Sequence, residues 1–175
     1  MIAGEMVALR PFIGTDVAFF EQRTNDFAYH GEFNSFGLQP HGKLQSGFAH
    51  SGLLDPRQGM LVVVLRGTET IVGNVSYHQV GYGPNEGSQS YNIGIALDPE
   101  QRGKGYGVEA QRLLAAYLFA TYPVMGIEAS TDINNLAEQR ALEKAGFTRE
   151  GIARKAQWRA GQYHDLVTYS KLRGE

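Results

Sequence analysis

The alternation of apolar and polar residues divides the chain into strands and helices. Strands are predicted at residues 6–12, 60–65, 71–80, 90–97 and 124–129, followed by two more around a turn at Gly161. Helices are predicted from a cap at Thr15-Asp16 through residue 26, at 106–121, and at 135–145, with Gly146 as a left-handed C-cap. This order predicts a right-handed crossover between the parallel strands 90–97 and 124–129.

Residues 25–59 interrupt this pattern. They are rich in glycine, histidine, asparagine and aromatic residues. The segment is too long for an idle loop in a compact domain, so we expect short helical turns within it and a functional role.

Composition narrows the classes of protein. A length of 175 residues predicts one domain spanning 1–175, and 42% hydrophobic with 19% charged residues is ordinary globular composition. A net charge of -2 argues against a nucleic-acid partner, and no run of ~18 apolar residues indicates a membrane span. Cysteine is absent, and the spacing of His30, His41 and His50 fits no metal site. We therefore expect a cytoplasmic protein without a metal.

The sequence Arg102-Gly103-Lys104-Gly105-Tyr106-Gly107 joins a predicted strand to a predicted helix. A glycine-rich loop at a helix N-terminus favours an anionic ligand, because its N–H groups and the helix dipole converge there. The Walker pattern is excluded, since Lys104 precedes glycine rather than serine or threonine. The dinucleotide fingerprint is excluded too, because Val108 occupies the position of its third glycine.

The loop instead resembles that of the GCN5-related N-acetyltransferase (GNAT) superfamily, which reads Arg or Gln, two residues, Gly, one residue, Gly or Ala. The segment from Asn135 to Leu142-Glu143-Lys144-Ala145-Gly146-Phe147 resembles the signature of that superfamily's next helix, and residues 149–172 resemble the closing hairpin of the RimJ/RimL-like branch. The resemblance spans residues 6–172. It implies an α/β fold of the α+β type: a mixed, twisted β-sheet of about six to seven strands, splayed at its centre and flanked by helices.

The same resemblance implies that acetyl-CoA is the co-substrate. The pantetheine arm would lie along the backbone of Ile95, Ala96 and Leu97. The remaining cofactor-binding positions are Arg102, Gly103, Lys104, Gly105, Tyr106, Gly107 and Asn135.

The implied activity is direct transfer of the acetyl group to a primary amine, either a small-molecule amine or a protein N-terminal α-amine. A backbone N–H near Ile95 would stabilise the oxyanion. The superfamily's usual proton-transfer groups are missing: Leu142 stands where many members have tyrosine, Glu138 where several Rim-type enzymes have serine, and Asn92 where they have glutamate. The remaining candidates for proton transfer are His78, Glu32 and Tyr91, with Asp132 acting through water. Residues 138–140 are interpreted as a solvated face.

The acceptor amine is expected to lie against the segment 25–59. Its candidate contacts are Tyr29, Phe33, Phe36 and Asn92. Because the usual acid and base are missing, a non-enzymatic acyl-CoA-binding or regulatory domain remains the alternative. Either a monomer or a homodimer is compatible with the sequence.

Overall fold

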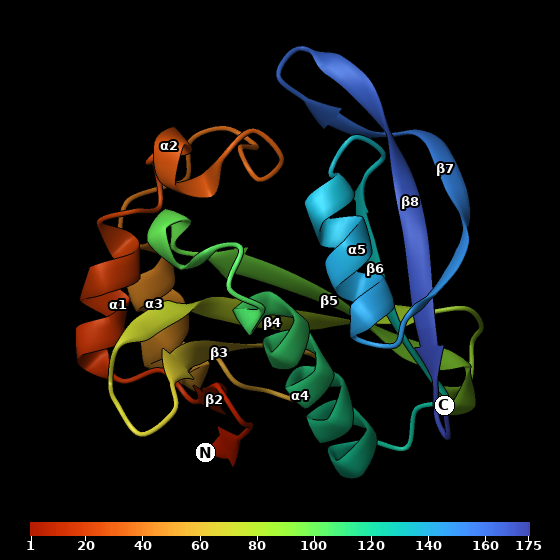
Figure 1. Cartoon of the computed structure of the whole chain (residues 1–175), viewed down its shortest axis with the longest axis horizontal. Helices are drawn as coiled ribbons and strands as arrows, with labels where there is room; N and C mark the ends of the chain where they lie inside the picture. Colours follow the sequence, from red (N-terminus) through yellow and green to blue (C-terminus); the bar gives the residue numbers. More distant parts are fainter.

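A mixed eight-stranded sheet runs through the computed structural model, which describes residues 1–175 (Figure 1). Its order is β1-β2-β3-β4-β5-β6-β8-β7, and only β5 and β6 are parallel neighbours. The strands are β1 (Ile2–Ala3), β2 (Val7–Arg10), β3 (Gln58–Leu65), β4 (Ile71–Gly81), β5 (Gln89–Leu97), β6 (Gly126–Asp132), β7 (Thr148–Arg159) and β8 (Gln162–Leu172). The predicted α+β sheet is confirmed, with one strand more than expected. The added strand, β1, has two residues and is too short to show alternation.

Five helices accompany the sheet. They are α1 (Gly14–Glu21), α2 (Phe27–His30), α3 (Lys43–Ser51), α4 (Tyr106–Thr121) and α5 (Leu136–Lys144), with 3-10 turns η1 (Glu86–Ser88) and η2 (Pro99–Gln101). The short helices expected within 25–59 are α2 and α3. The start and end predicted for the first helix were wrong: Ile13 is the N-cap of α1, and Asp16 accepts its N–H at 2.8 Å. Gly146 (φ 89°) follows α5 in the left-handed conformation predicted for it. None of the helices is long and apolar enough to cross a membrane.

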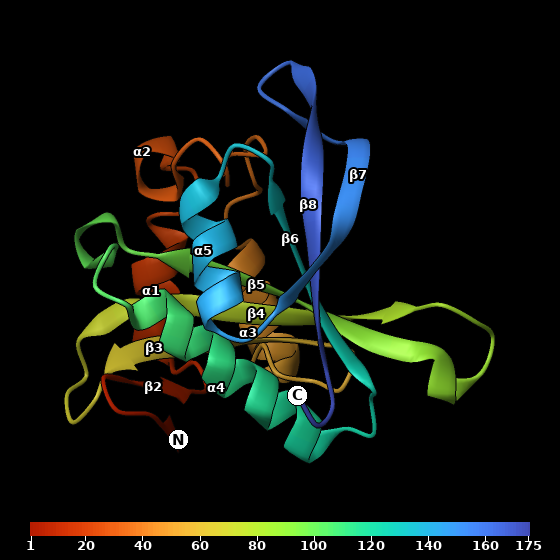
Figure 2. The ribbon, with the colours of Figure 1, turned by 45° about the vertical axis from the view of Figure 1, so that its right-hand side comes forward.

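The helices cover both faces of the sheet. Successive side chains of each strand point to opposite faces, so each strand contributes to both. On one face α4 packs over the larger apolar cluster, which includes Val75, Tyr91 and Leu114. On the other face α1 and α3 cover a smaller cluster that includes Phe20 and Val62 (Figure 2). The sheet therefore separates two apolar clusters, one on each face.

The sheet opens where its two parallel strands meet. β5 and β6 pair only at Tyr91–Ile93 with Ile127–Ala129, although β5 continues to Leu97 and β6 to Asp132. The other edge of β5 stays paired with β4 as far as Leu97. The predicted central splay is thus present, and beyond Ile93 the β6-facing edge of β5 has no strand partner.

Two segments that are distant in sequence border this opening. The segment around α2 and the outer end of the β7–β8 hairpin project on the same side of the molecule (Figures 1 and 2). The guanidinium of Arg159 lies 5.5 Å from the ring centre of Phe33 and thereby links them. Arg159 also donates to Asp132 at 2.6 Å, with both side chains buried. The buried ion pair holds the hairpin against the end of β6.

Candidate active site

The glycine loop that leads into α4 is shaped by two residues in the left-handed conformation. Gly103 has φ 76° and Gly105, the N-cap residue of α4, has φ 85°. Only glycine adopts this conformation without a steric cost. No side chain caps the N-terminus of α4. Its first N–H groups are therefore left for a ligand, at the end of the helix where the dipole favours an anion.

The third glycine of the loop has a different physical role. A Cβ atom on Gly107 would lie 3.3 Å from Cδ1 of Leu97 and 3.6 Å from Cδ1 of Ile95. The first of these distances is tighter than ordinary van der Waals contact. The bare backbone at Gly107 lets the first turn of α4 lie close to the end of β5.

A cavity of about 700 Å³ lies among the glycine loop, the end of β5, α5 and the segment after α2; we call it the loop cavity. Seven of the ten predicted cofactor residues line it: Ile95, Leu97, Arg102, Gly103, Gly105, Gly107 and Asn135. Glu32 and Phe33, predicted for proton transfer and acceptor binding, line it as well. The glycine loop and the unpaired edge of β5 therefore both line the loop cavity.

The other three predicted cofactor residues lie outside this cavity. Ala96 lines a separate cavity of about 240 Å³. Lys104 is exposed, and its Nζ donates to Oε1 of Gln101 at 3.1 Å. Tyr106 is partly buried and packs against the larger apolar cluster. Their side chains consequently do not form the walls of the loop cavity.

Arg102 and Asn135 organise the backbone around the loop cavity. The Nε of Arg102 donates to the carbonyl of Leu97 at 3.1 Å, and a terminal nitrogen donates to the carbonyl of Tyr29. Asn135 is the N-cap of α5: its side chain accepts the N–H of Glu138 at 3.3 Å and donates to Thr131 at 3.0 Å. Both residues tie neighbouring segments together at the cavity wall.

Two further cavities lie on the side of α1 and α3, and the smaller of them adjoins the loop cavity. The one of about 240 Å³ contains Tyr29 and Phe36 and shares His30 and Asn34 with the loop cavity. It shares Met60, among other residues, with a third cavity of about 680 Å³. We call these two the acceptor-side cavities.

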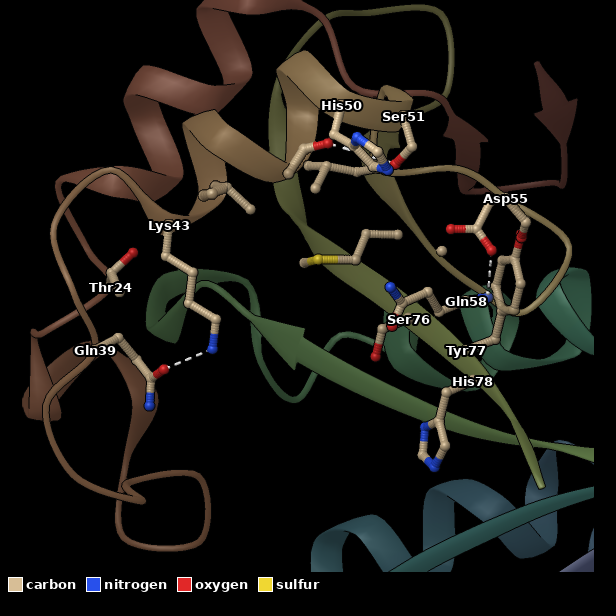
Figure 3. Close-up of a pocket in the computed structure, with 15 residues that line it drawn as sticks. Thr24, Gln39, Lys43, His50, Ser51, Asp55, Gln58, Ser76, Tyr77 and His78 are labelled. Carbon is tan, nitrogen blue, oxygen red and sulfur yellow. Dashed lines mark hydrogen bonds between the residues drawn. The ribbon is translucent and has the colours of Figure 1, made fainter. Parts of the chain in front are cut away.

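The larger acceptor-side cavity lies between α3 and the strands β3 and β4. Figure 3 shows Lys43 and His50 of α3 on one side of it, and Ser76 and His78 of β4 on the other. Lys43 donates to Gln39 at 2.8 Å. These polar groups occupy the face of the sheet that α3 covers.

The predicted proton-transfer and acceptor residues are dispersed among these cavities. His78 lines the larger acceptor-side cavity, and Asn92 pairs with it across β4 and β5. Glu32 is exposed at the loop cavity. Tyr91 lines none of the three: it is 1% exposed, and its hydroxyl donates to the carbonyl of Pro56 at 2.6 Å. Burial raises the pKa of Tyr91 to about 12.

The sequence interpretation missed Glu138. This residue was assigned to a solvated face, but it is partly buried and lines the loop cavity. Burial raises its pKa to about 7, although a hydrogen bond from Gln111 acts in the opposite direction. Glu138 lies four residues before Leu142, which is 1% exposed, and this spacing places both on one face of α5. Two signals were available, namely this helical spacing and the position of Glu138 where several Rim-type enzymes have serine.

No three His, Asp or Glu side chains of the structure converge in an arrangement that would hold a metal ion. Among the acidic groups nearest the opening, Asp132 is committed to its contacts with Arg159, with His164 at 3.0 Å and with the N–H of Asn134 at 2.8 Å. Burial alone would raise the pKa of Asp132, but these partners together lower it. Its carboxylate is therefore a structural group that holds the end of β6 to the outer end of the β7–β8 hairpin.

A splayed sheet with an uncapped glycine loop at the opening is the arrangement that the resemblance to the acetyltransferase superfamily implied. Residues 7–148 match the family described as "Acetyltransferase (GNAT) domain". The chain belongs to this family, and the predicted superfamily is confirmed.

Several known proteins are similar to this chain. "Probable N-acetyltransferase YjcK" of Bacillus subtilis (strain 168) is 42% identical over 87 residues, which is 50% of this chain and 46% of that protein. The chain thus matches about half the length of that relative. In fold it is similar to "RimL- Ribosomal L7/L12 alpha-N-protein acetyltransferase" in complex with coenzyme A, with a TM-score of 0.80, 17% identity and coverage of 97% and 95% of the two chains. Spermidine N-acetyltransferase from Vibrio cholerae, solved with coenzyme A and spermine, has a TM-score of 0.79, 19% identity and 95% coverage of both chains.

Proposed function

We propose that this protein is an acetyl-CoA-dependent N-acetyltransferase that transfers the acetyl group directly to a primary amine. The observation that carries the proposal is the convergence of two features on the loop cavity. The uncapped N-terminus of α4 offers N–H groups for the pyrophosphate. The edge of β5 beyond Ile93 offers unpaired backbone groups for the pantetheine amides.

The thioester would lie where β5 and β6 diverge. From that point the acetyl group faces the acceptor-side cavities, while the rest of the co-substrate stays in the loop cavity. A backbone N–H of β5 near Ile95, directed at the thioester oxygen, would stabilise the oxyanion that forms when the amine attacks. The protein therefore contributes mainly positioning and one preorganised dipole to the first step.

The acceptor must reach this point with a neutral nitrogen. An alkyl ammonium with pKa near 10.4 pays roughly 4–5 kcal/mol to lose its proton at pH 7, whereas an α-amine near 7.7–8.0 pays only about 1. The acceptor-side cavities hold no buried carboxylate placed as a base. Of the histidines that line them, His50 and His78 are exposed, and His30 lies 3.1 Å from the carbonyl oxygen of Thr24. An acceptor of low pKa fits this environment best.

The charges of the acceptor-side cavities also favour an acceptor with a single amine. Two side chains there are cationic, Arg23 and Lys43, against one carboxylate, Asp55. Asp55 already accepts the N–H groups of Arg57 at 2.8 Å and Gln58 at 3.1 Å. A polyamine would meet net repulsion here. The proposed acceptor is therefore a single amine of low pKa, namely a protein N-terminal α-amine or a small molecule such as an amino sugar.

Thiol release from acetyl-CoA, measured with a panel of amines, tests the proposal. The panel contains N-terminal peptides, amino sugars, long-chain alkyl amines and spermidine, and we expect turnover with the first two groups. Fast turnover of alkyl amines or spermidine would contradict the proposed acceptor class. Tight binding of coenzyme A without turnover of any amine would instead establish the alternative, a non-enzymatic acyl-CoA-binding domain.

A further inference from the structure

Glu138 projects from the first turn of α5 into the loop cavity. Its Oε1 accepts a hydrogen bond from Nε2 of Gln111 at 2.8 Å. Gln111 belongs to α4 and is 1% exposed, so the amide is fixed in the seam between the two helices. The carboxyl group is thereby held at the cavity wall that α5 contributes, facing the space assigned above to the co-substrate.

The surroundings of Glu138 favour a carboxyl group that carries its proton at neutral pH. Burial raises its pKa to about 7, against the opposing effect of Gln111. The charged or titratable side chains that line the same cavity are His30 and Glu32 beside α2, Arg102 in the glycine loop, and Arg140 and Lys144 on α5. None of them forms a salt bridge with Glu138. No ion pair therefore opposes the effect of burial on the pKa of Glu138.

We propose that Glu138 is the general acid of the transfer, donating its proton to the departing thiolate of coenzyme A. The assignment rests on the proposed function. As the amine nitrogen bonds to the acetyl carbon, the carbon–sulfur bond breaks and its electron pair goes to sulfur. Sulfur takes the proton of Glu138, the amide nitrogen releases one proton to solvent, and the Glu138 carboxylate recovers a proton from solvent. The products are the N-acetylated amine and free coenzyme A thiol.

The structure also stabilises Glu138 after it has given up the proton. Its position in the first turn of α5 places the carboxylate near the positive end of the helix dipole. Gln111 continues to donate to it. Because the site stabilises both the protonated and the ionised carboxyl group, Glu138 can donate and recover a proton in each catalytic cycle near neutral pH.

Other acids near the opening do not meet these requirements. Asp132 is engaged by Arg159, and the hydroxyls of Tyr91 and Tyr77 donate to the backbone carbonyls of Pro56 and Asp55. Glu32 lines the cavity but is exposed. Glu138 alone among these combines access to the loop cavity with a carboxyl group whose pKa is raised by burial.

Glu138→Gln tests the role, because glutamine keeps an oxygen to accept from Gln111 and loses only the acidic proton. We expect kcat to fall 10²–10³-fold, while the KM for acetyl-CoA and the Kd for coenzyme A stay within about threefold. In the wild-type enzyme kcat should decline above about pH 7 at saturating substrates, and this decline should vanish in the variant. The matched control is Glu143→Gln, an exposed position of the same helix, which should leave kcat unchanged.

A second variant keeps the proposal testable if Glu138→Gln fails to fold. Gln111→Met removes the hydrogen bond that lowers the pKa of Glu138, so the alkaline decline of kcat should move to higher pH. A folded Glu138→Gln enzyme with kcat within threefold of wild type overturns the proposal, as does a loss explained by weaker coenzyme A binding. An unmoved pH profile in Gln111→Met also overturns it. Absence of wild-type turnover with every amine is a different result, because it removes the proposed function itself.

Discussion

The carboxylate of Glu109 fastens the N-terminal strands to the helix that carries the glycine loop. It lies in the first turn of α4, is 8% exposed, and accepts the backbone N–H groups of Glu5, Met6 and Val7. The bonds to Met6 and Val7 are 2.9 Å long. Gly4 makes this approach possible, because a Cβ there would lie 2.5 Å from Oε1 of Glu109.

Replacing Glu109 by glutamine should cost about 3 kcal/mol of unfolding free energy at pH 7. Hydrogen bonds to a charged acceptor contribute about 1.5–3 kcal/mol each. In either orientation the new NH₂ group would point at a backbone N–H that formerly had an acceptor, so at least one bond is lost and the others lose their charge. For a chain of this size the change corresponds to a fall in Tm of about 6–12 °C.

The cost of this substitution should depend on pH with a definite sign. Burial by itself would raise the pKa of Glu109, but the three backbone donors and Arg112 outweigh it, and the pKa is lowered. A lowered pKa in the folded state means that the stabilisation is present above the pKa of the unfolded chain, near 4.5. It is lost as pH falls through the folded-state value. The difference between wild type and Glu109→Gln should therefore shrink in acid.

Urea unfolding of the two proteins at pH 7 and at pH 3, followed by circular dichroism, measures both effects. The matched control is Glu86→Gln, an exposed position whose side chain makes no hydrogen bond, and it should lie within about 0.5 kcal/mol of wild type at both pH values. A loss below about 1 kcal/mol for Glu109→Gln at pH 7, or a larger loss that persists undiminished at pH 3, would refute the reasoning.

Two further perturbations probe the loop and the hairpin. Gly105→Val places a β-branched residue at φ 85°, so the loop must rearrange. Coenzyme A should then bind at least tenfold more weakly, as measured by calorimetry. The control Gly151→Ala, whose new Cβ atom meets open space, should bind coenzyme A normally. Asp132→Asn leaves the buried Arg159 without its counter-charge and should cost about 3–5 kcal/mol at pH 7. Because the pKa of Asp132 is lowered, this cost should diminish as pH falls through its folded-state value, and a cost independent of pH would exclude the ion pair as its source.

The local pattern of the chain predicted most of the elements that frame the site. The helix 106–121 has the bounds expected from its periodicity, and the parallel pairing of β5 with β6 follows from the crossover between them. Gly103 and Gly105 adopt the left-handed conformation that a glycine-rich loop suggests. Backbone preferences and side-chain periodicity act over a few residues, so the sequence contains them directly.

Tertiary packing decided which polar groups face the site. Tyr91 was a candidate for proton transfer, yet it is buried against α4 and bonded to the carbonyl of Pro56. Glu138 was assigned to solvent, yet the contact between α4 and α5 turns it into the loop cavity beside Gln111. Residues 43 and 138 are far apart in sequence, yet each lines a cavity that shares residues with the same third cavity of about 240 Å³.

By itself, then, the sequence determined the elements, the glycine loop and the family. The tertiary structure decided the walls of the cavities, the raised pKa of Glu138 and the anchoring of residues 5–7 by Glu109. The physical reason is that burial and charge at a side chain depend on which distant segments pack against it, and local periodicity carries no information about that partner.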